Sequence, residues 1–256
     1  MNEFTIIEKY LKPLSIKTSG ALKLSDDVFL DNKNGIAISL DTYVEKIHFL
    51  NSFDPNKFLK KVLRASLSDL YCKGIKPKNY FLSFSLRKNL AKKKWLKKVK
   101  NILNSEQKKF NIHLSGGDIT KSSKLVITVA VLGYFKHKPI LRSGAKINDD
   151  IYVTGNIADS FIGLNIMKKK FNFGNLNHFY LKKYLEPNLQ VNFSSHLHKI
   201  ANSSIDISDG LMNDLNHICL NSKCGAFVDL NLLPFSSKSK YLIKNKKIKL
   251  KNVFSN

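Results

Sequence analysis

Hydrophobic positions in the first half of the chain follow helical spacing in some segments and strand spacing in others. A helix should begin at Asp54-Pro55, because an aspartate followed by proline is typical of a helix start, and Asp69 should lie near its end. Two further stretches have helical spacing, residues 3–11 and the lysine-rich residues 91–110. Apolar or alternating runs predict strands at 36–41, 79–86, 112–116 and 124–135.

A turn-rich segment at 136–150 separates this half from a second series of elements. After it we expect strands at 151–155, 203–207 and 225–230, and helices at 157–169, 176–185, 189–201 and 210–222. Alternating strands and helices predict an α/β or α+β fold. We therefore predict two domains, 1–137 and 148–256. Residues 236–256 are rich in lysine and asparagine and do not complete the second domain, which we expect to be truncated.

The composition narrows the possible partners. The formal net charge of +24 favours a polyanion partner, but arginine occurs only at positions 64, 87 and 142. Surfaces that read nucleic-acid bases usually use arginine, so we do not expect a nucleic-acid partner. No apolar run reaches the roughly 20 residues needed to cross a bilayer, so no membrane association is expected. The three cysteines lack CxxC spacing, which favours reduced thiols in a cytoplasmic protein.

The acidic residues carry most of the chemical information. The chain has 14 aspartates and five glutamates, and seven aspartates lie close to glycine, serine, threonine or another aspartate: 26, 27, 41, 69, 118, 206 and 209. Each alone is better explained as a turn or a helix cap. Taken together they favour hard-cation binding, as in Mg²⁺-dependent phosphate chemistry.

Two other features are compatible with phosphate binding. Gly116-Gly117 would let backbone N–H groups approach a phosphate closely, and Arg142 could clamp one, although a surface charge in a turn explains Arg142 equally well. Other site classes are disfavoured. None of the seven histidines pairs with a serine or cysteine in a recognisable motif for nucleophilic catalysis. No group of cysteines and histidines has the spacing of a zinc site. Walker A, GxGxxG and protein-kinase motifs are absent from the sequence.

Seven segments in chain order form a recognisable set: EFTIIEKYLKP, LSDDVFL, ISLDTYVEKIHF, ASLSDLYCKGIKPKNYFLSFSL, SGGDIT, LRSGAKINDDIYVTG and IDISDGLMNDLNHI. The set resembles the motifs of the thiamine-monophosphate kinase family, within the aminoimidazole ribonucleotide synthetase-like superfamily. The chain departs from the family pattern at Ser25, Leu40, Lys46 and Lys121, and it lacks the family's "GG.DYEL" motif.

The resemblance implies a role for each matching residue. It implies Mg²⁺ binding by Asp27, Ser39, Asp41, Asp69, Asp118, Asp206 and Asp209, with Thr42 adding a hydroxyl. It implies ATP contacts at Gly117, Asp118, Arg142 and Ser208, and catalytic roles for Asp41, Asp69 and Asp118. His48 matches a substrate-contacting position; without the resemblance we would interpret it as a histidine packed at a strand end.

The implied reaction is direct in-line transfer of the γ-phosphate of ATP to thiamine monophosphate, with several Mg²⁺ ions and no phosphoenzyme. The implied fold is a two-domain one, in which the N-terminal domains of a homodimer share a β-barrel and the nucleotide lies between the acidic motifs and the second domain. Two alternatives stay open at this point. One is a sister ATP-dependent enzyme of the superfamily with another substrate, and the other is an inactive copy that binds polyanions through lysine.

Overall fold

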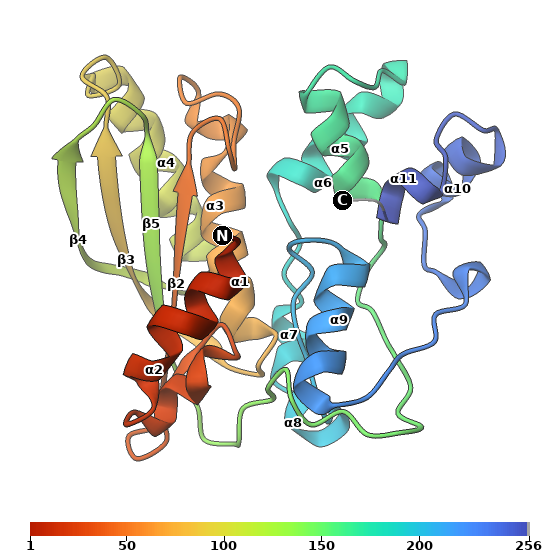
Figure 1. Cartoon of the computed structure of the whole chain (residues 1–256). Coiled ribbons are helices and arrows are strands. Elements are labelled where there is room, and N and C mark those ends of the chain that lie inside the picture. Colours follow the sequence, from red (N-terminus) through yellow and green to blue (C-terminus); the bar gives the residue numbers. More distant parts are fainter. Residues whose placement is uncertain (255–256) are drawn as a thin grey trace.

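The computed structural model describes residues 1–254 and contains one five-stranded sheet. Figure 1 shows this sheet on one side of the molecule. The strand order is β1-β2-β5-β3-β4, and every neighbouring pair is antiparallel except β3–β4. The bounds are β1 Phe29–Asp31, β2 Ile36–Val44, β3 Lys76–Leu86, β4 His113–Lys121 and β5 Val126–Tyr134. All four strands predicted for this half are present, and β2, β3 and β4 extend beyond their predicted bounds.

Two amphipathic helices cover one face of this sheet. They are α3 (Leu59–Tyr71) and α4 (Lys93–Phe110), and α3 packs on β2, β3 and β5. The apolar side chains of β5 on that face, Ile127, Val129 and Val131, are completely buried in the main core. Because side chains alternate along a strand, every second residue of β2 and β5 points to the opposite face, where Leu40 and Thr42 of β2 are exposed. We call the helix-covered side the inner face and the other side the outer face.

The remaining helices are short. The chain begins with α1 (Glu3–Ile6), a π-helical turn (Ile7–Leu11) and α2 (Lys12–Ser15), and 3₁₀ turns lie at Ser19–Leu24, Pro55–Lys57, Gly174–Leu176 and Leu230–Leu232. The second half holds α5 (Asp159–Met167), α6 (Asn177–Leu185), α7 (Val191–Ser194), α8 (Leu197–Ile200), α9 (Leu211–Ser222), α10 (Ser237–Lys244) and α11 (Lys251–Phe254). None of the helices in the described part of the chain has the length and apolar character needed to cross a membrane.

The second half has its own small apolar cluster, formed by Ile162, Ile166, Tyr180, Leu242 and Ile248. Figure 1 shows this half on the side of α3 away from the sheet. The predicted helices at 157–169, 176–185 and 210–222 are confirmed as α5, α6 and α9. The single helix predicted at 189–201 is wrong, because this segment forms two short helices, α7 and α8.

The three strands predicted in the second half are also wrong. Residues 151–155, 203–207 and 225–230 join no sheet within residues 1–254, where the second half has only an isolated bridge between Ile157 and Phe235. Tyr152 and Phe227 are 87% and 90% exposed. A strand needs a neighbour to pair its backbone groups and to cover its side chains. The apolar pattern of a segment says nothing about whether that neighbour is present.

Candidate active site

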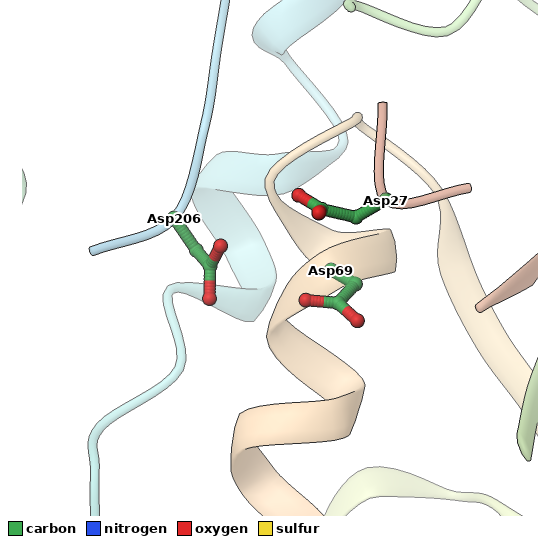
Figure 2. A group of neighbouring side chains, drawn as sticks. All are labelled: Asp27, Asp69 and Asp206. Carbon is green, nitrogen blue, oxygen red and sulfur yellow. The ribbon is translucent and has the colours of Figure 1, made fainter. Parts of the chain in front are cut away.

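Three carboxylates from distant parts of the chain meet at the C-terminal end of α3 (Figure 2). Asp69 lies in the last turns of this helix, Asp27 in the turn before β1, and Asp206 in the extended segment before α9. One oxygen of each carboxylate lies within 4.8 Å of the other two. Oxygen ligands at this spacing suit a hard divalent cation such as Mg²⁺.

The three carboxylates repel one another in a poorly solvated place. Burial raises the pKa of Asp69 well above its usual value, and the nearby charges of Asp41, Asp206 and Asp27 raise it further. Burial also raises the pKa of Asp206, although a hydrogen bond donated by the Ser68 hydroxyl opposes this shift. A divalent cation among these groups would remove the repulsion, so the donor set fits a bound metal.

Two basic residues lie beside the cluster. The guanidinium of Arg142 pairs with Asp27, and the backbone N–H of Arg142 donates to Asp26 Oδ2 over 2.8 Å. Lys73 Nζ lies 2.8 Å from Asp26 Oδ1, and the Lys73 side chain is completely buried. Sequence reasoning missed Lys73, because its position just after a helix resembles that of many surface lysines. Arg142, for which the resemblance implied a contact with ATP, therefore lies beside the carboxylates.

Strand β2 contributes a second polar group on the inner face. Ser39 is buried and its hydroxyl donates to the backbone oxygen of Ser66 over 3.4 Å. Asp41 Oδ2 accepts a hydrogen bond of 2.8 Å from the Tyr43 hydroxyl, which also lies 3.1 Å from the Ser66 hydroxyl. Burial raises the pKa of Tyr43, and the charge of Asp41 adds to this, so Tyr43 stays a donor. Asp41 is not one of the three converging carboxylates, but it lies near enough to Asp69 for its charge to raise the pKa of Asp69, and it is held by a tyrosine that sequence reasoning missed.

A tight loop presents Ser208 and Asp209 immediately after Asp206. The backbone N–H groups of Ser208, Asp209 and Gly210 all donate to Asp214 Oδ2, over 3.0, 3.1 and 3.0 Å. Burial raises the pKa of Asp214 to about 6, with smaller contributions from Asp206 and Asp209. Asp214 was missed, although an acidic residue in the first turn of a predicted helix is a recognisable capping signal.

Comparisons with known proteins fit this arrangement. The family model described as "AIR synthase related protein, N-terminal domain" matches residues 24–135. The thiamine-monophosphate kinase of Buchnera aphidicola subsp. Schizaphis graminum is 39% identical over 242 residues, covering 92% of this chain and 74% of that protein. The Escherichia coli K12 enzyme of the same name is 36% identical over 241 residues, covering 91% of this chain and 73% of its own length. This chain belongs to the thiamine-monophosphate kinase family.

Solved structures agree with this family assignment. A complex of AaThiL with AMPPCP and TMP superimposes with a TM-score of 0.86 at 25% identity, covering 99% of this chain and 82% of that one. The thiamine monophosphate kinase of Aquifex aeolicus gives a TM-score of 0.78 at 26% identity, with 92% and 82% covered. The predicted family, the mixed α/β fold class and the assignment as a phosphotransferase are confirmed.

Three residues that the family resemblance assigned to the site, Thr42, Gly117 and Asp118, lie away from the carboxylates at the end of α3. Thr42 points to the outer face, where its hydroxyl lies 2.9 Å from that of Thr128. The strand register places Thr42, Thr128, Ser83 and Asp118 in one row across the sheet. Three strand spacings of about 4.8 Å put Asp118 about 14 Å from Thr42. Within one chain, neither Thr42 nor Asp118 meets the carboxylates at α3.

Gly117 also belongs to this distant strand. It pairs with Leu82 inside the β3–β4 ladder, and its φ is +152°. A Cβ there would lie 1.9 Å from the Leu82 carbonyl oxygen. The glycine is therefore needed for the approach of the two strands, whatever it does for a nucleotide.

His48 lies in the turn after β2, beside the Asp41–Tyr43 pair. Its Nδ1 accepts a hydrogen bond of 2.9 Å from the backbone N–H of Val44. Its ring meets the edge of Tyr43 with 5.7 Å between centroids. Because Nδ1 is an acceptor, the neutral ring carries its proton on Nε2, which is then the nitrogen that could donate to a substrate.

Proposed function

We propose that this chain transfers the γ-phosphoryl group of ATP to the phosphate of thiamine monophosphate, forming thiamine diphosphate and ADP. The observation that carries the proposal is the convergence of Asp27, Asp69 and Asp206 beside Arg142 in a member of this kinase family. The names of the relatives and the AaThiL complex, which holds AMPPCP (an ATP analogue) and TMP, support both substrates.

The residues present fit Mg²⁺, which we propose as the metal. Asp27, Asp69 and Asp206 would hold it. Asp209 follows Asp206 on the same segment, and Ser39 and Asp41 lie on β2, which packs against α3. When bound, magnesium ions neutralise the phosphate oxygens and help to align the transferred group.

The protein groups have separate tasks in this proposal. Arg142 offers a planar fork that suits a phosphate, and Ser208 lies on a loop whose shape Asp214 fixes. In this proposal His48 donates from Nε2 to thiamine monophosphate, which is supported by the hydrogen bond that its Nδ1 accepts from Val44. The substrate phosphate is already an oxyanion at neutral pH, so the reaction needs little help from a general base, and none of these side chains has to remove a proton.

We also propose that the site is completed in a homodimer. Strand β1 pairs only with Ile36–Ile38 of β2, so in the described chain one edge of β2 is open from Ser39 to Val44. Strand β4 is the other edge of the sheet, and all of its residues are exposed. A second copy related by a two-fold axis could place its β4 beside β2 at both open edges, closing a barrel. This pairing would bring strand β4 of the partner subunit, which carries Gly117 and Asp118, next to strand β2, which carries Asp41 and Thr42.

The reaction is tested by incubating the purified chain with ATP, Mg²⁺ and thiamine monophosphate and separating the products by chromatography. Thiamine diphosphate and ADP should form in equal amounts, and neither should form when Mg²⁺ is chelated. Binding of ATP without any thiamine diphosphate would contradict the proposal and favour a sister enzyme with another acceptor.

Mixing two inactive variants tests the shared site. Asp69→Asn and Asp118→Asn should each be inactive alone. After unfolding and refolding together, half of the dimers carry one copy of each variant, and one of their two sites has both native residues. About a quarter of the native activity should return. If Asp69 and Asp118 of the same chain served one site, the mixture would remain inactive.

We make two further proposals, about the division of the chain into domains and about its location in the cell. The two separate apolar clusters support a division of the chain into domains at 1–137 and 148–256, as the sequence predicted. The three cysteines form no disulfide in the described residues, which supports a reducing, cytoplasmic location.

A further inference from the structure

Lys73 is a charged residue in a place where charges are rare. It follows the C-cap residue of α3, Cys72, and only 1% of its surface is exposed. Removing an ammonium group from water is strongly unfavourable unless partners compensate for the lost hydration. Lys73 has two such partners, because its Nζ lies 2.8 Å from Asp26 Oδ1 and donates to the backbone oxygen of Ser204 over 3.1 Å.

These two contacts join segments that lie far apart in the sequence. Asp26 precedes Asp27, and its other oxygen accepts the backbone N–H of Arg142. Ser204 lies two residues before Asp206, and its own N–H donates to Leu141 over 2.9 Å. One buried ammonium therefore ties the Asp27 turn and the Asp206 segment to the end of the helix that carries Asp69.

We propose that Lys73 is a positioning residue that holds Asp27 and Asp206 around Asp69 before the metal binds. The inference rests on the proposed function, because it assigns the three carboxylates to Mg²⁺. Without this tie, the mutual repulsion of the carboxylates would push the three segments apart, and the binding of Mg²⁺ would have to reassemble them. Replacing a residue that holds the metal ligands in place without binding the metal itself typically changes metal affinity by about 10- to 100-fold.

The test compares Lys73→Met with Lys60→Met as a matched control. Lys60 also forms an ion pair between α3 and the second half, with Glu186 at 2.8 Å, but this pair is partly exposed. Titration calorimetry with MgCl₂ in the absence of nucleotide should show about tenfold weaker binding for Lys73→Met and unchanged binding for Lys60→Met. The Mg²⁺ concentration for half-maximal thiamine diphosphate formation should rise by a similar factor, while kcat at saturating Mg²⁺ falls less than about threefold.

A second variant keeps the test decisive if Lys73→Met does not fold. Asp26→Asn removes the charge that pairs with Lys73, and it should weaken Mg²⁺ binding in the same way. If both variants fold, the double variant should bind Mg²⁺ no more weakly than Lys73→Met alone, because the two residues act as one unit.

Unchanged or tighter Mg²⁺ binding in Lys73→Met, or in Asp26→Asn if only that variant folds, would overturn the inference. Lys73 would then be a competing cation or an ordinary structural residue. If the native chain itself forms no thiamine diphosphate, the proposed function fails. An active native chain whose variants bind Mg²⁺ normally removes only the role of Lys73.

Discussion

At the level of single residues, Asp69 occupies the least favourable surroundings for a charge among the candidate ligands. It is only 8% exposed and faces the carboxylates of Asp27, Asp41 and Asp206. Such a position weakens the metal-free protein and strengthens the attraction for a divalent cation, because the same repulsion is relieved when the cation binds. Function and stability therefore make opposite demands on this residue.

Replacing Asp69 with asparagine should separate these two demands. Asp69→Asn keeps the size of the side chain and removes its charge, so the metal-free variant should melt at a higher temperature than the native protein. Thiamine diphosphate formation should fall by about 100-fold or more, because a ligand is lost. Thermal melts with and without MgCl₂ check both effects, since the stabilisation by Mg²⁺ should shrink. Asp31→Asn, at the end of β1, should change neither property by much, because an amide oxygen can still accept the backbone N–H groups of Lys33 and Asn34. A lower melting temperature for metal-free Asp69→Asn would contradict this explanation.

The raised pKa values also predict how the stability of the metal-free protein depends on pH. For Asp69, Asp206 and Asp214 the pKa in the folded state lies above the usual value of 3.8, and for Asp214 it is about 6. Their protonation favours the folded state below about pH 4, and this contribution is lost as the pH rises through the folded pKa values. The urea midpoint should therefore be higher at pH 5 than at pH 7.5.

The Asp69→Asn variant provides the comparison for this pH effect. It should show a smaller decrease between pH 5 and pH 7.5, because one of the responsible groups no longer titrates. Desolvation and His137 lower the pKa of His198, which therefore acts in the opposite direction, but His198 is the same in both proteins. Identical pH profiles for the two proteins would show that the Asp69 carboxylate does not titrate as described.

At the level of secondary structure elements, α3 and β4 show two ways in which an element positions functional groups. Helix α3 is fixed by burial, because Leu63, Leu67 and Leu70 are almost completely buried against the sheet and Asp69 lies beside Leu70. Strand β4 is held only on one side, by parallel pairing with β3, and none of its side chains is buried. The position of Asp118 thus depends on close backbone contact.

Gly117→Ala tests this dependence. The new Cβ would lie 1.9 Å from the Leu82 oxygen at a φ that disfavours side chains, so β4 must move. We expect a loss of about 3 kcal/mol in the free energy of unfolding. Gly225→Ala has open space around the added methyl group and should change stability by less than about 0.5 kcal/mol. Urea unfolding measures both, and equal midpoints for the two variants would contradict the close contact.

At the level of the whole molecule, the outer face of the sheet leaves apolar side chains exposed in the described chain. It presents Leu40, which is 66% exposed, and Phe81, which is 40% exposed, in one row across the strands. Apolar side chains in a row on an open sheet face are typical of a surface that another protein covers. A second copy on this face would also close the free edges of β2 and β4.

Leu40→Lys should therefore prevent dimer formation. The lysine would place a charge within the proposed apolar interface. Activity should fall when the dimer is lost, because each site would then lack Asp118 of the partner subunit. Light scattering after size-exclusion chromatography measures the molar mass. Leu96→Lys, a change of the same kind at a 43% exposed leucine of α4, should leave both dimer and activity intact. An active monomeric Leu40→Lys variant would show that one chain suffices.

The local pattern of the sequence by itself determined the family, the four long strands of the first half and helices α3 and α4. It did not predict β1, and the helix start predicted at Asp54-Pro55 was wrong, because Asp54 caps a separate 3₁₀ turn and α3 begins at Leu59. The apolar spacing of α3 and β5 is a property of neighbouring residues, and the motifs around Asp27, Asp41, Asp69 and Asp206 are short enough to be recognised without a structure. For the same reason, Asp69 was correctly expected near the end of a helix.

Only the tertiary structure decided which of these residues meet. Asp69 and Asp206 come together because the segment before α9 packs on the end of α3, whereas Asp118 lies across the sheet from β2. Lys73 and Tyr43 gained their roles from partners distant in the sequence, and the segments at 151–155 and 225–230 formed no strands because no partner pairs with them in the described chain. Local spacing determines which face a side chain occupies, but contacts between distant segments determine what it faces.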